Sequence, residues 1–463
     1  MRMLQRYDYD NKHNKNNGKY KRQIAGILLA GLLFISVLLT GCGGDSGSSS
    51  SGSSSNPNDP DQILMSITDS QGASSARTIS WRTPSDMKES SVYLLMGEAP
   101  EDESLWGSAI EIAGEPSLDL TKKYGKYNHF EADITGLSEG AYCYVVGASN
   151  GIDEKLEGMS EPITFTIQSE YDMISRSNIL FFADTQPEGS IDEYKELAKL
   201  VDVAREKYPD AGLALQIGDL VNQGDSPEEW GALLDEIQSS MSGLALLTAP
   251  GNHEVTPFVN IEGRKPEYYL NVFSLPKNGP EGFEEEYYSF DYGSVHILSL
   301  SSNYLDPAET YSDDEAEAAE IAARIDEWIE NDLAQTMKPW KIVMMHQPAF
   351  PLVGDSTSAG MAERWIPIFD RNYVNLIICG HQHEFMRTWP MREGLESKYG
   401  VVQVMGNASM KSYETSDNQL PFVAFEAGGV RGFHSITATE KELSVEAFNS
   451  DGKSIDFWST QKQ

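Results

Sequence analysis

Leu244-Ala245-Leu246-Leu247-Thr248 is followed two residues later by Gly251-Asn252-His253-Glu254. The apolar run predicts a buried strand, and the polar residues then lie in the loop after it. Four further apolar runs end in polar clusters of the same kind. These clusters are Asp184-Thr185-Gln186, Gly218-Asp219, His346 and Gly380-His381-Gln382-His383. Because open α/β sheets bind their ligands at the carboxyl ends of the strands, we expect all five clusters to meet at one edge of a sheet.

Residues from about 177 to 463 alternate between predicted strands and predicted helices. Two capping boxes, which begin at Ser190 and Ser226, and two further runs of helical spacing indicate four helices. These helices cover about residues 190–204, 226–237, 321–333 and 361–369. A hairpin is predicted to turn at Tyr292-Gly293, and three strands end the chain. The pattern predicts the α/β fold class with a mixed sheet.

Residues 61–169 have a different pattern, in which short alternating apolar runs are separated by turn residues. About seven short strands over roughly 100 residues predict a β-sandwich. Thr135–Tyr142 resembles the turn before a late strand of fibronectin type III modules, and Thr78–Arg82 resembles an early strand of the N-terminal domain of purple acid phosphatases. We therefore expect an all-β domain at 61–169, without site residues, ahead of a second domain at 177–463.

The composition limits the partners and the disulfide chemistry of the chain. The 463 residues carry a formal net charge of −36 at pH 7, which should repel nucleic acids and anionic lipids. The three cysteines, Cys42, Cys143 and Cys379, lie far apart in unlike segments and predict no disulfide framework.

Cys42 has a separate explanation in the residues that precede it. Residues 2–22 are basic and polar, and residues 24–39 form a charge-free, mostly apolar stretch of 16 that is short for a membrane span of about 20 residues. The pattern resembles a bacterial lipoprotein signal, with residues 1–41 as the signal peptide and Cys42 as the lipid-modified first residue. The alternative is an uncleaved anchor helix. Both predict an exported protein on the outer face of the cell membrane, with the Gly/Ser-rich residues 42–60 as a flexible spacer.

The five polar clusters together offer two aspartates, one asparagine, one glutamine and three further histidines besides His253. Such mixed oxygen and imidazole ligands bind two cations if one carboxylate bridges them, and they favour Fe, Mn or Zn over Ca²⁺. A metal pair about 3.5–4 Å apart holds both the attacking and the leaving oxygens of a displacement at phosphorus and generates a metal-bound hydroxide. The clusters therefore predict a hydrolase of phosphate esters.

The order of the clusters resembles that of the calcineurin-like metallophosphoesterases, and Tyr287–His296 further resembles the purple acid phosphatase branch. The resemblance implies a mixed β-sandwich flanked by helices, the αββα arrangement. It also implies that one metal is held by Asp184, Gln186, Asp219 and His383. The other metal would be held by Asp219, Asn252, His346 and His381. Asp219 is then the bridge, while His253 faces the phosphate and stabilises or protonates the leaving oxygen.

Two positions depart from the family pattern. Many members carry histidine where Gln186 stands, so the first metal is expected to be held more weakly, to be a harder ion, or not to bind Gln186 at all. Purple acid phosphatases supply a tyrosine where this chain has Asn222, so no phenolate is available to iron and the purple colour should be absent. Glu254 is expected to orient His253 or a neighbouring loop, and His296 and His434 to be structural.

We expect a surface-anchored phosphomonoesterase that acts on small phosphate esters. A phosphodiesterase on the same site is the first alternative, since Arg264 and Lys265 would either reach a second phosphate or be solvated. A surface binding protein with a degenerate site is the second alternative, suggested by Gln186 and the N-terminal sandwich. The sequence makes no prediction about oligomeric state or native metals.

Overall fold

The computed structural model describes residues 56–101, 103–117, 126–152, 156–255, 265–305, 311–312, 314–415 and 420–462. The predicted signal peptide, Cys42 and Arg264 lie outside the described residues. Residues 56–463 form one compact unit. No helix within the described part of that unit is long and apolar enough to cross a bilayer.

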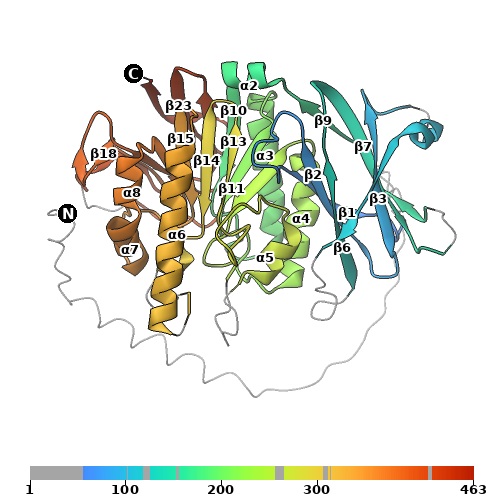
Figure 1. Cartoon of the computed structure of the whole chain (residues 1–463), viewed down its shortest axis with the longest axis horizontal. Coiled ribbons are helices and arrows are strands. Elements are labelled where there is room, and N and C mark those ends of the chain that lie inside the picture. Colours follow the sequence, from blue (N-terminus) through green and yellow to red (C-terminus); the bar gives the residue numbers. More distant parts are fainter. Residues whose placement is uncertain are drawn as a thin grey trace, which may run out of the picture. The chain divides into compact units, whose positions relative to one another are not determined.

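Two sheets that face one another form the centre of the C-terminal region (Figure 1). Three parallel strands of the ten-stranded sheet are β10 (Ser177–Phe182), β11 (Leu213–Ile217) and β12 (Ala245–Ala249). The parallel strands of the seven-stranded sheet are β14 (Val295–Leu300), β15 (Trp340–Met345), β16 (Leu376–Cys379) and β20 (Val402–Met405). These strands are apolar and almost wholly buried, as expected for parallel strands that are covered on both faces.

Helices cover the outer faces of both sheets. On β14, Ile297 packs into the core between the sheets, whereas its neighbour Leu298 packs into a second core together with α6 (Glu315–Gln335). The helices α7 (Ser356–Arg364) and α8 (Ile366–Arg371) belong to that same second core. The helices α3 (Tyr194–Lys207) and α4 (Pro227–Met241) pack into the first core with the ten-stranded sheet. The predicted αββα arrangement is confirmed.

The local signals for helix starts are present in the structure. Ser190 and Glu193 form both halves of a capping box in η4 (Ile191–Glu193), directly before α3, and the Ser226 hydroxyl caps α4. The single helix predicted over 361–369 is wrong, because α7 ends and α8 begins on either side of Trp365. Proline at the second residue of α8 lacks an N–H donor and so cannot continue the hydrogen-bond ladder of α7.

Antiparallel strands complete both sheets. The hairpin of β13 (Tyr288–Tyr292) and β14 turns through Gly293, which has a φ of 55°. At the end of the chain, β22 (Gly432–Ala438) pairs antiparallel with β10 and is followed by β23 (Glu442–Asn449) and β24 (Ser454–Gln461). Four elements are not among those predicted from the sequence: β17 (Phe385–Thr388), β21 (Val423–Ala427), α2 (Glu170–Ser175) and α5 (Glu267–Val272).

The N-terminal region is a sandwich of two sheets around its own apolar core. Its first sheet contains β1 (Asp61–Ser66), β2 (Arg77–Pro84), β6 (Tyr127–Ile134) and β5 (Glu115–Pro116). Its second sheet contains β4 (Ile110–Ala113), β3 (Glu89–Met96), β7 (Gly140–Ser149), β8 (Gly158–Met159) and β9 (Ile163–Ile167).

The first of these sheets is continuous with the ten-stranded sheet of the C-terminal region. Strand β1 lies parallel to β12, with Met65 opposite Ala245. Leu64 packs into the C-terminal core, whereas Met65 packs into the sandwich core. The Gln62 amide also donates a hydrogen bond of 2.8 Å to Asp235 of α4. One sheet therefore runs across the boundary that the sequence predicts between 61–169 and 177–463.

Candidate metal centre

The residues of the five polar clusters meet where the parallel strands of both sheets end. Asp184 and Gln186 follow β10, Asp219 follows β11, and Asn252 and His253 follow β12. On the other sheet His346 follows β15, while His381 and His383 follow β16. The site thus lies at the carboxyl edge of both sheets, where open α/β folds bind ligands.

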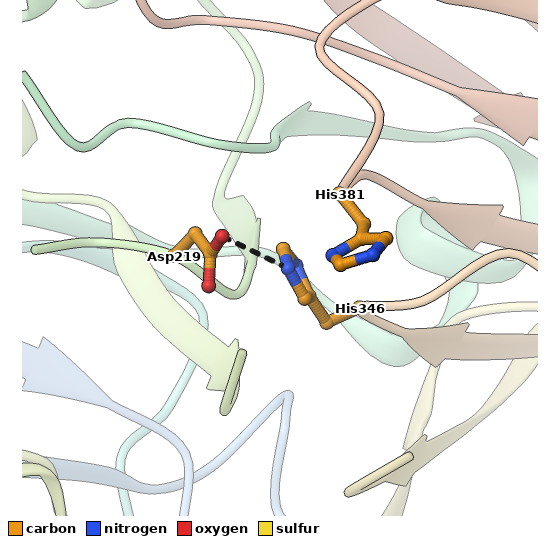
Figure 2. A group of neighbouring side chains, drawn as sticks. All are labelled: Asp219, His346 and His381. Atoms are coloured by element: carbon orange, nitrogen blue, oxygen red, sulfur yellow. Dashed lines mark ion pairs between the residues drawn. The ribbon is translucent and has the colours of Figure 1, made fainter. Parts of the chain in front are cut away.

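Asp219 belongs to two groups of side chains whose ligand atoms lie within 4.8 Å of one another. One group is Asp219, His346 and His381, which Figure 2 shows converging from three different segments. The other group is Asp184, Asp219 and His383. The His346 Nε2 atom lies 3.1 Å from Asp219 Oδ2, and His383 Nε2 lies 3.8 Å from Asp184 Oδ1. The arrangement offers two neighbouring cation sites that share one carboxylate.

The two amide side chains extend these groups. Gln186 Nε2 lies 3.1 Å from Asp219 Oδ2 and 3.3 Å from His383 Nε2. Asn252 Oδ1 lies 3.0 Å from His381 Nδ1. Within the described part of the chain, the buried Gln186 Oε1 and His383 Nδ1 atoms have no hydrogen-bond partner. Because buried polar atoms almost always have partners, these two orphans fit a site that is completed by a cation.

Four of these residues have left-handed backbone conformations. The φ angles are 52° at Asp184, 53° at Asp219, 75° at His381 and 51° at His383. Non-glycine residues adopt this region at a cost of about 1–3 kcal/mol, and such strain concentrates at functional sites. With this backbone conformation, each side chain turns back from the end of its strand into the site.

The glycines of the clusters provide the space for these turns. A Cβ atom at Gly251 would lie 2.3 Å from Asp219 Oδ1, and one at Gly380 would lie 2.3 Å from Asp184 Oδ2. A Cβ atom at Gly218 would lie 2.6 Å from His346 Nδ1. Any larger residue at these positions would displace a proposed ligand.

Buried neighbours fix the orientation of the central carboxylate and imidazole. The Glu254 carboxylate accepts hydrogen bonds from the backbone N–H groups of Asp219 at 2.8 Å and Gly251 at 2.6 Å, so it ties together the loops after β11 and β12. His346 Nδ1 lies 2.9 Å from the Ile217 carbonyl oxygen, which directs Nε2 towards Asp219. Glu254 thus supports a neighbouring loop, in line with its predicted role.

The crowding of carboxylates and imidazoles perturbs their ionisation. Burial raises the pKa of Asp184 to about 8. Burial disfavours charge on Asp219 too, but the attraction of His346, with that of His253 and His381, holds the pKa of Asp219 below its ordinary value. The pKa of His346 is raised to about 9, because the attraction of Asp219 exceeds the effect of burial. Charged groups held this close in a buried site are typical of functional sites.

His253 lies at the rim of the centre rather than inside it. Its Nδ1 atom lies 2.8 Å from the Asn222 carbonyl oxygen, and its Nε2 atom lies 3.8 Å from Asp219 Oδ2. The side chain is 29% exposed, compared with 3% for Asp219. This position suits a group that acts on a substrate rather than a metal ligand.

The two departures from the family pattern have different outcomes. Gln186 lies within the group around Asp219, as described above. Asn222 lies outside it, since its side-chain amide donates to the Pro187 carbonyl at 2.7 Å. Lys265 donates to the Gly282 carbonyl and lies 5.3 Å from the centre of the Phe283 ring.

Sequence reasoning missed the segment that follows β20. Ser409 Oγ donates to the Gln186 carbonyl oxygen at 2.7 Å, and the Tyr413 ring lies edge-on to His383 with 5.6 Å between centroids. Residues 401–405 form an apolar run that ends in Gly406-Asn407, so the same pattern of strand followed by glycine and a polar residue could have identified this segment. Asp355, with Oδ2 3.7 Å from His381 Nε2, was also missed.

Part of the chain is similar in sequence to known proteins. Residues 177–385 match the family model of the calcineurin-like phosphoesterases. An uncharacterized protein of Mycobacterium tuberculosis is 29% identical over 184 residues, which are 37% of this chain and 33% of that protein. Purple acid phosphatase 22 of Arabidopsis thaliana is 24% identical over 175 residues, which are 37% of each chain. The chain thus spans about a third of the length of these relatives.

Two solved structures share the fold. A purple acid phosphatase from yellow lupin (Lupinus luteus) seeds superposes with a TM-score of 0.68 and 17% identity, covering 88% of this chain and 75% of its own. The structure of PhoD superposes with a TM-score of 0.60 and 13% identity, covering 88% of this chain and 91% of its own. This chain has the mixed α/β fold of both structures.

Proposed function

We propose that this chain, whose residues 177–385 match the calcineurin-like phosphoesterases, is a metal-dependent phosphoric ester hydrolase that acts on phosphomonoesters. The observation that carries the proposal is Asp219, which belongs to both groups of clustered ligands. A shared carboxylate is what a dinuclear site requires.

The residues present fit two cations. Asp184, Gln186 and His383 would hold one, Asn252, His346 and His381 would hold the other, and Asp219 would bridge them. When bound, such a metal pair supplies Lewis acidity towards phosphoryl oxygens and lowers the pKa of a bound water. The nitrogen and oxygen ligands favour Fe, Mn or Zn.

The chain's own residues supply orientation and proton transfer. Glu254 holds the Asp219 loop against the Gly251 loop through its two backbone hydrogen bonds. The Asn222 carbonyl accepts from His253 Nδ1, which turns Nε2 towards the site. A protonated His253 placed there donates to the oxygen of the departing alcohol, which otherwise leaves as an alkoxide.

Turnover of two model esters tests the proposal. The full chain, loaded in turn with Mn, Fe or Zn, should hydrolyse p-nitrophenyl phosphate faster than bis-p-nitrophenyl phosphate and should contain two metal ions per chain. Faster hydrolysis of the diester would make the protein a phosphodiesterase. Absence of turnover with both metals bound would contradict the proposal and favour a binding protein.

We also propose that a lipid on Cys42 anchors the protein to the outer face of the cell membrane. The support is the sequence of residues 1–42, in which a basic segment and a short apolar stretch precede the cysteine. Replacement of Cys42 by alanine should abolish lipid attachment and leave the precursor uncleaved or the protein released from the membrane. A Cys42→Ala protein that is still processed and membrane-bound as before would contradict this proposal.

A further inference from the structure

The segment 406–415, which follows β20, forms one wall of the candidate metal centre. It is attached to both ligand-bearing segments on the Asp184 side. The Ser409 hydroxyl donates to the Gln186 carbonyl, and the Tyr413 N–H donates to the His383 carbonyl at 3.3 Å. The Tyr413 ring then meets the His383 ring at an interplanar angle of 83°. The wall is therefore fixed relative to the proposed ligands.

Lys411 lies between these two attachment points. Its backbone N–H donates to Ser409 Oγ at 3.0 Å, and its carbonyl oxygen accepts from the Asn407 side chain at 2.9 Å. The same Asn407 amide also lies 3.3 Å from the Val430 carbonyl oxygen, so the backbone around Lys411 is held on two sides. These hydrogen bonds hold the backbone of Lys411 in place and so fix the position from which its side chain starts.

The ammonium of Lys411 lies beside the ring of Tyr413, which belongs to the segment that contacts His383. Its Nζ atom is 5.7 Å from the centre of the Tyr413 ring, which itself contacts His383. Among the described residues, no carboxylate lies within 4.0 Å of Lys411 Nζ. The half-buried side chain carries a cation without an ion-pair partner in that part of the chain.

Three other cations of the C-terminal region have partners among the described residues. Arg387 forms an ion pair with Asp456 at 2.6 Å, and Arg364 forms one with Asp326 at 2.9 Å. Lys341 donates to the Leu333 and Asn372 carbonyls. Unlike these three cations, Lys411 belongs to a segment that is hydrogen-bonded to the backbone of two proposed ligands, Gln186 and His383.

We propose that Lys411 is a specificity-determining residue that binds a non-bridging oxygen of the substrate phosphate and favours monoesters over diesters. This inference rests on the phosphoric ester hydrolase proposed above. A phosphomonoester carries about −1.5 to −2 charges at pH 7, whereas a diester carries one. A fixed cation attracts the more highly charged ester more strongly, and lysine binds phosphate as a point charge.

Four variants of the full chain test the proposal. Lys411→Met keeps most of the apolar stem and removes the charge, Lys411→Ala removes both, and Lys411→Arg keeps the charge. Lys441→Met is the matched control, because Lys441 is exposed in the turn between β22 and β23, at the edge of the sheet opposite the metal centre. Metal content and melting temperature should stay near wild type in all four.

Two readouts are needed for each variant. The first is the affinity for inorganic phosphate, measured by calorimetry on metal-loaded protein, which should fall about tenfold in Lys411→Met and stay near wild type in Lys411→Arg. The second is the kinetics with the two nitrophenyl esters. KM for the monoester should rise about tenfold in Lys411→Met, while kcat/KM for the diester should change less than twofold.

Several outcomes would overturn the inference. Unchanged phosphate affinity in Lys411→Met would show that the ammonium does not bind the anion, and an equal loss with both esters would show that it does not discriminate charge. Loss of metal in both Lys411→Met and Lys411→Ala would make Lys411 a structural support. If wild type hydrolyses neither ester, the hydrolase proposal fails, whereas the phosphate calorimetry still decides whether Lys411 binds the anion.

Discussion

Asp61 in the N-terminal sandwich and Asp219 in the metal centre are both aspartates at the ends of strands in one sheet, yet their surroundings differ. Arg82 donates to both oxygens of Asp61, at 2.7 and 2.6 Å, and the pair is complete. Asp219 instead contacts His346, Gln186 and the backbone N–H of His253. Buried atoms beside it still have no hydrogen-bond partner among the described residues. The carboxylate of Asp61 is therefore fully paired within the chain, whereas the site around Asp219 requires a cation to complete it.

The most severe test of this contrast is Asp219→Asn. The change removes the charge shared by both proposed cation sites, so turnover should fall by about 10⁴-fold or more, well beyond the ~10–100-fold cost of losing an outer partner of a metal site. Metal content, measured by elemental analysis, should fall with it.

Asp61→Asn is the matched control for that variant. Asp61 is 44% exposed, so its ion pair should contribute less than about 1 kcal/mol to stability. Turnover and metal content should remain at wild-type values. If Asp219→Asn resembled Asp61→Asn in either measurement, Asp219 would not be the bridging ligand.

His253→Ala sharpens the comparison within the centre. Because His253 lies at the rim, metal content should stay near wild type while kcat falls by about 10²–10⁴-fold. The loss should be larger for an alkyl phosphate than for an aryl phosphate, since the alkyl leaving group needs more protonation. Equal losses with metals intact would indicate charge stabilisation, and loss of metal would make His253 a ligand or its support.

Leu64→Ala tests whether the packing of β1 against the C-terminal core contributes only to the stability of the fold, and not to the metal centre. Leu64 is 5% exposed and packs into the C-terminal core, so its truncation should lower the free energy of unfolding by about 2–4 kcal/mol. Turnover at 25 °C and metal content per folded chain should not change. A reduced metal stoichiometry in folded Leu64→Ala would show that the sandwich supports the site as well as the fold.

His296 provides a smaller effect that depends on pH. Its ring nitrogens lie 2.8 Å from Asp291 and 2.7 Å from Asp332, and Lys338 Nζ lies 3.9 Å from Asp291. Burial opposes the charged form, but the two carboxylates raise the pKa of His296 to about 9. The raised pKa makes the contribution to stability complete below about pH 6.5 and lost as the pH rises through 9.

His296→Gln should therefore cost about 2–3 kcal/mol at pH 6 and less than about 1 kcal/mol at pH 9.5. Urea unfolding at the two pH values measures the difference. A cost that is independent of pH would mean that the imidazole acts by packing rather than by charge. Turnover should be unaffected, because His296 lies at the start of β14, away from the carboxyl edge.

The sequence was informative where the chemistry is local to the end of a strand. Asp184, Asp219 and His346 each end an apolar run. The parallel strands β10 and β11 bring Asp184 and Asp219 to one edge of their sheet, and His346 lies at the corresponding edge of the facing sheet. The capping box at Ser190 is similarly local, because its partners lie within three residues. The break of the fourth helix was readable too, since Pro367 stands inside the predicted run.

The remaining features depend on contacts between distant segments. Ser409 meets Gln186 across 223 residues, and no local pattern specifies that contact. The short alternating apolar runs of residues 61–169 predict a separate sandwich, and the first of these runs begins with Ile63-Leu64-Met65. These residues are in fact buried consecutively, on both faces, which is the pattern of an interior strand.

The pairing of β1 with β12 also bears on how the protein is made. Synthesis proceeds from the N-terminus, and domains generally fold as they emerge. The sandwich strands can pair with one another at once, but Met65 must wait until Ala245 has been synthesised. Until then one side of β1 presents unpaired backbone groups, which invite pairing with other chains. A nascent chain that stalls before β12 should therefore depend on chaperones to a degree that the finished protein does not.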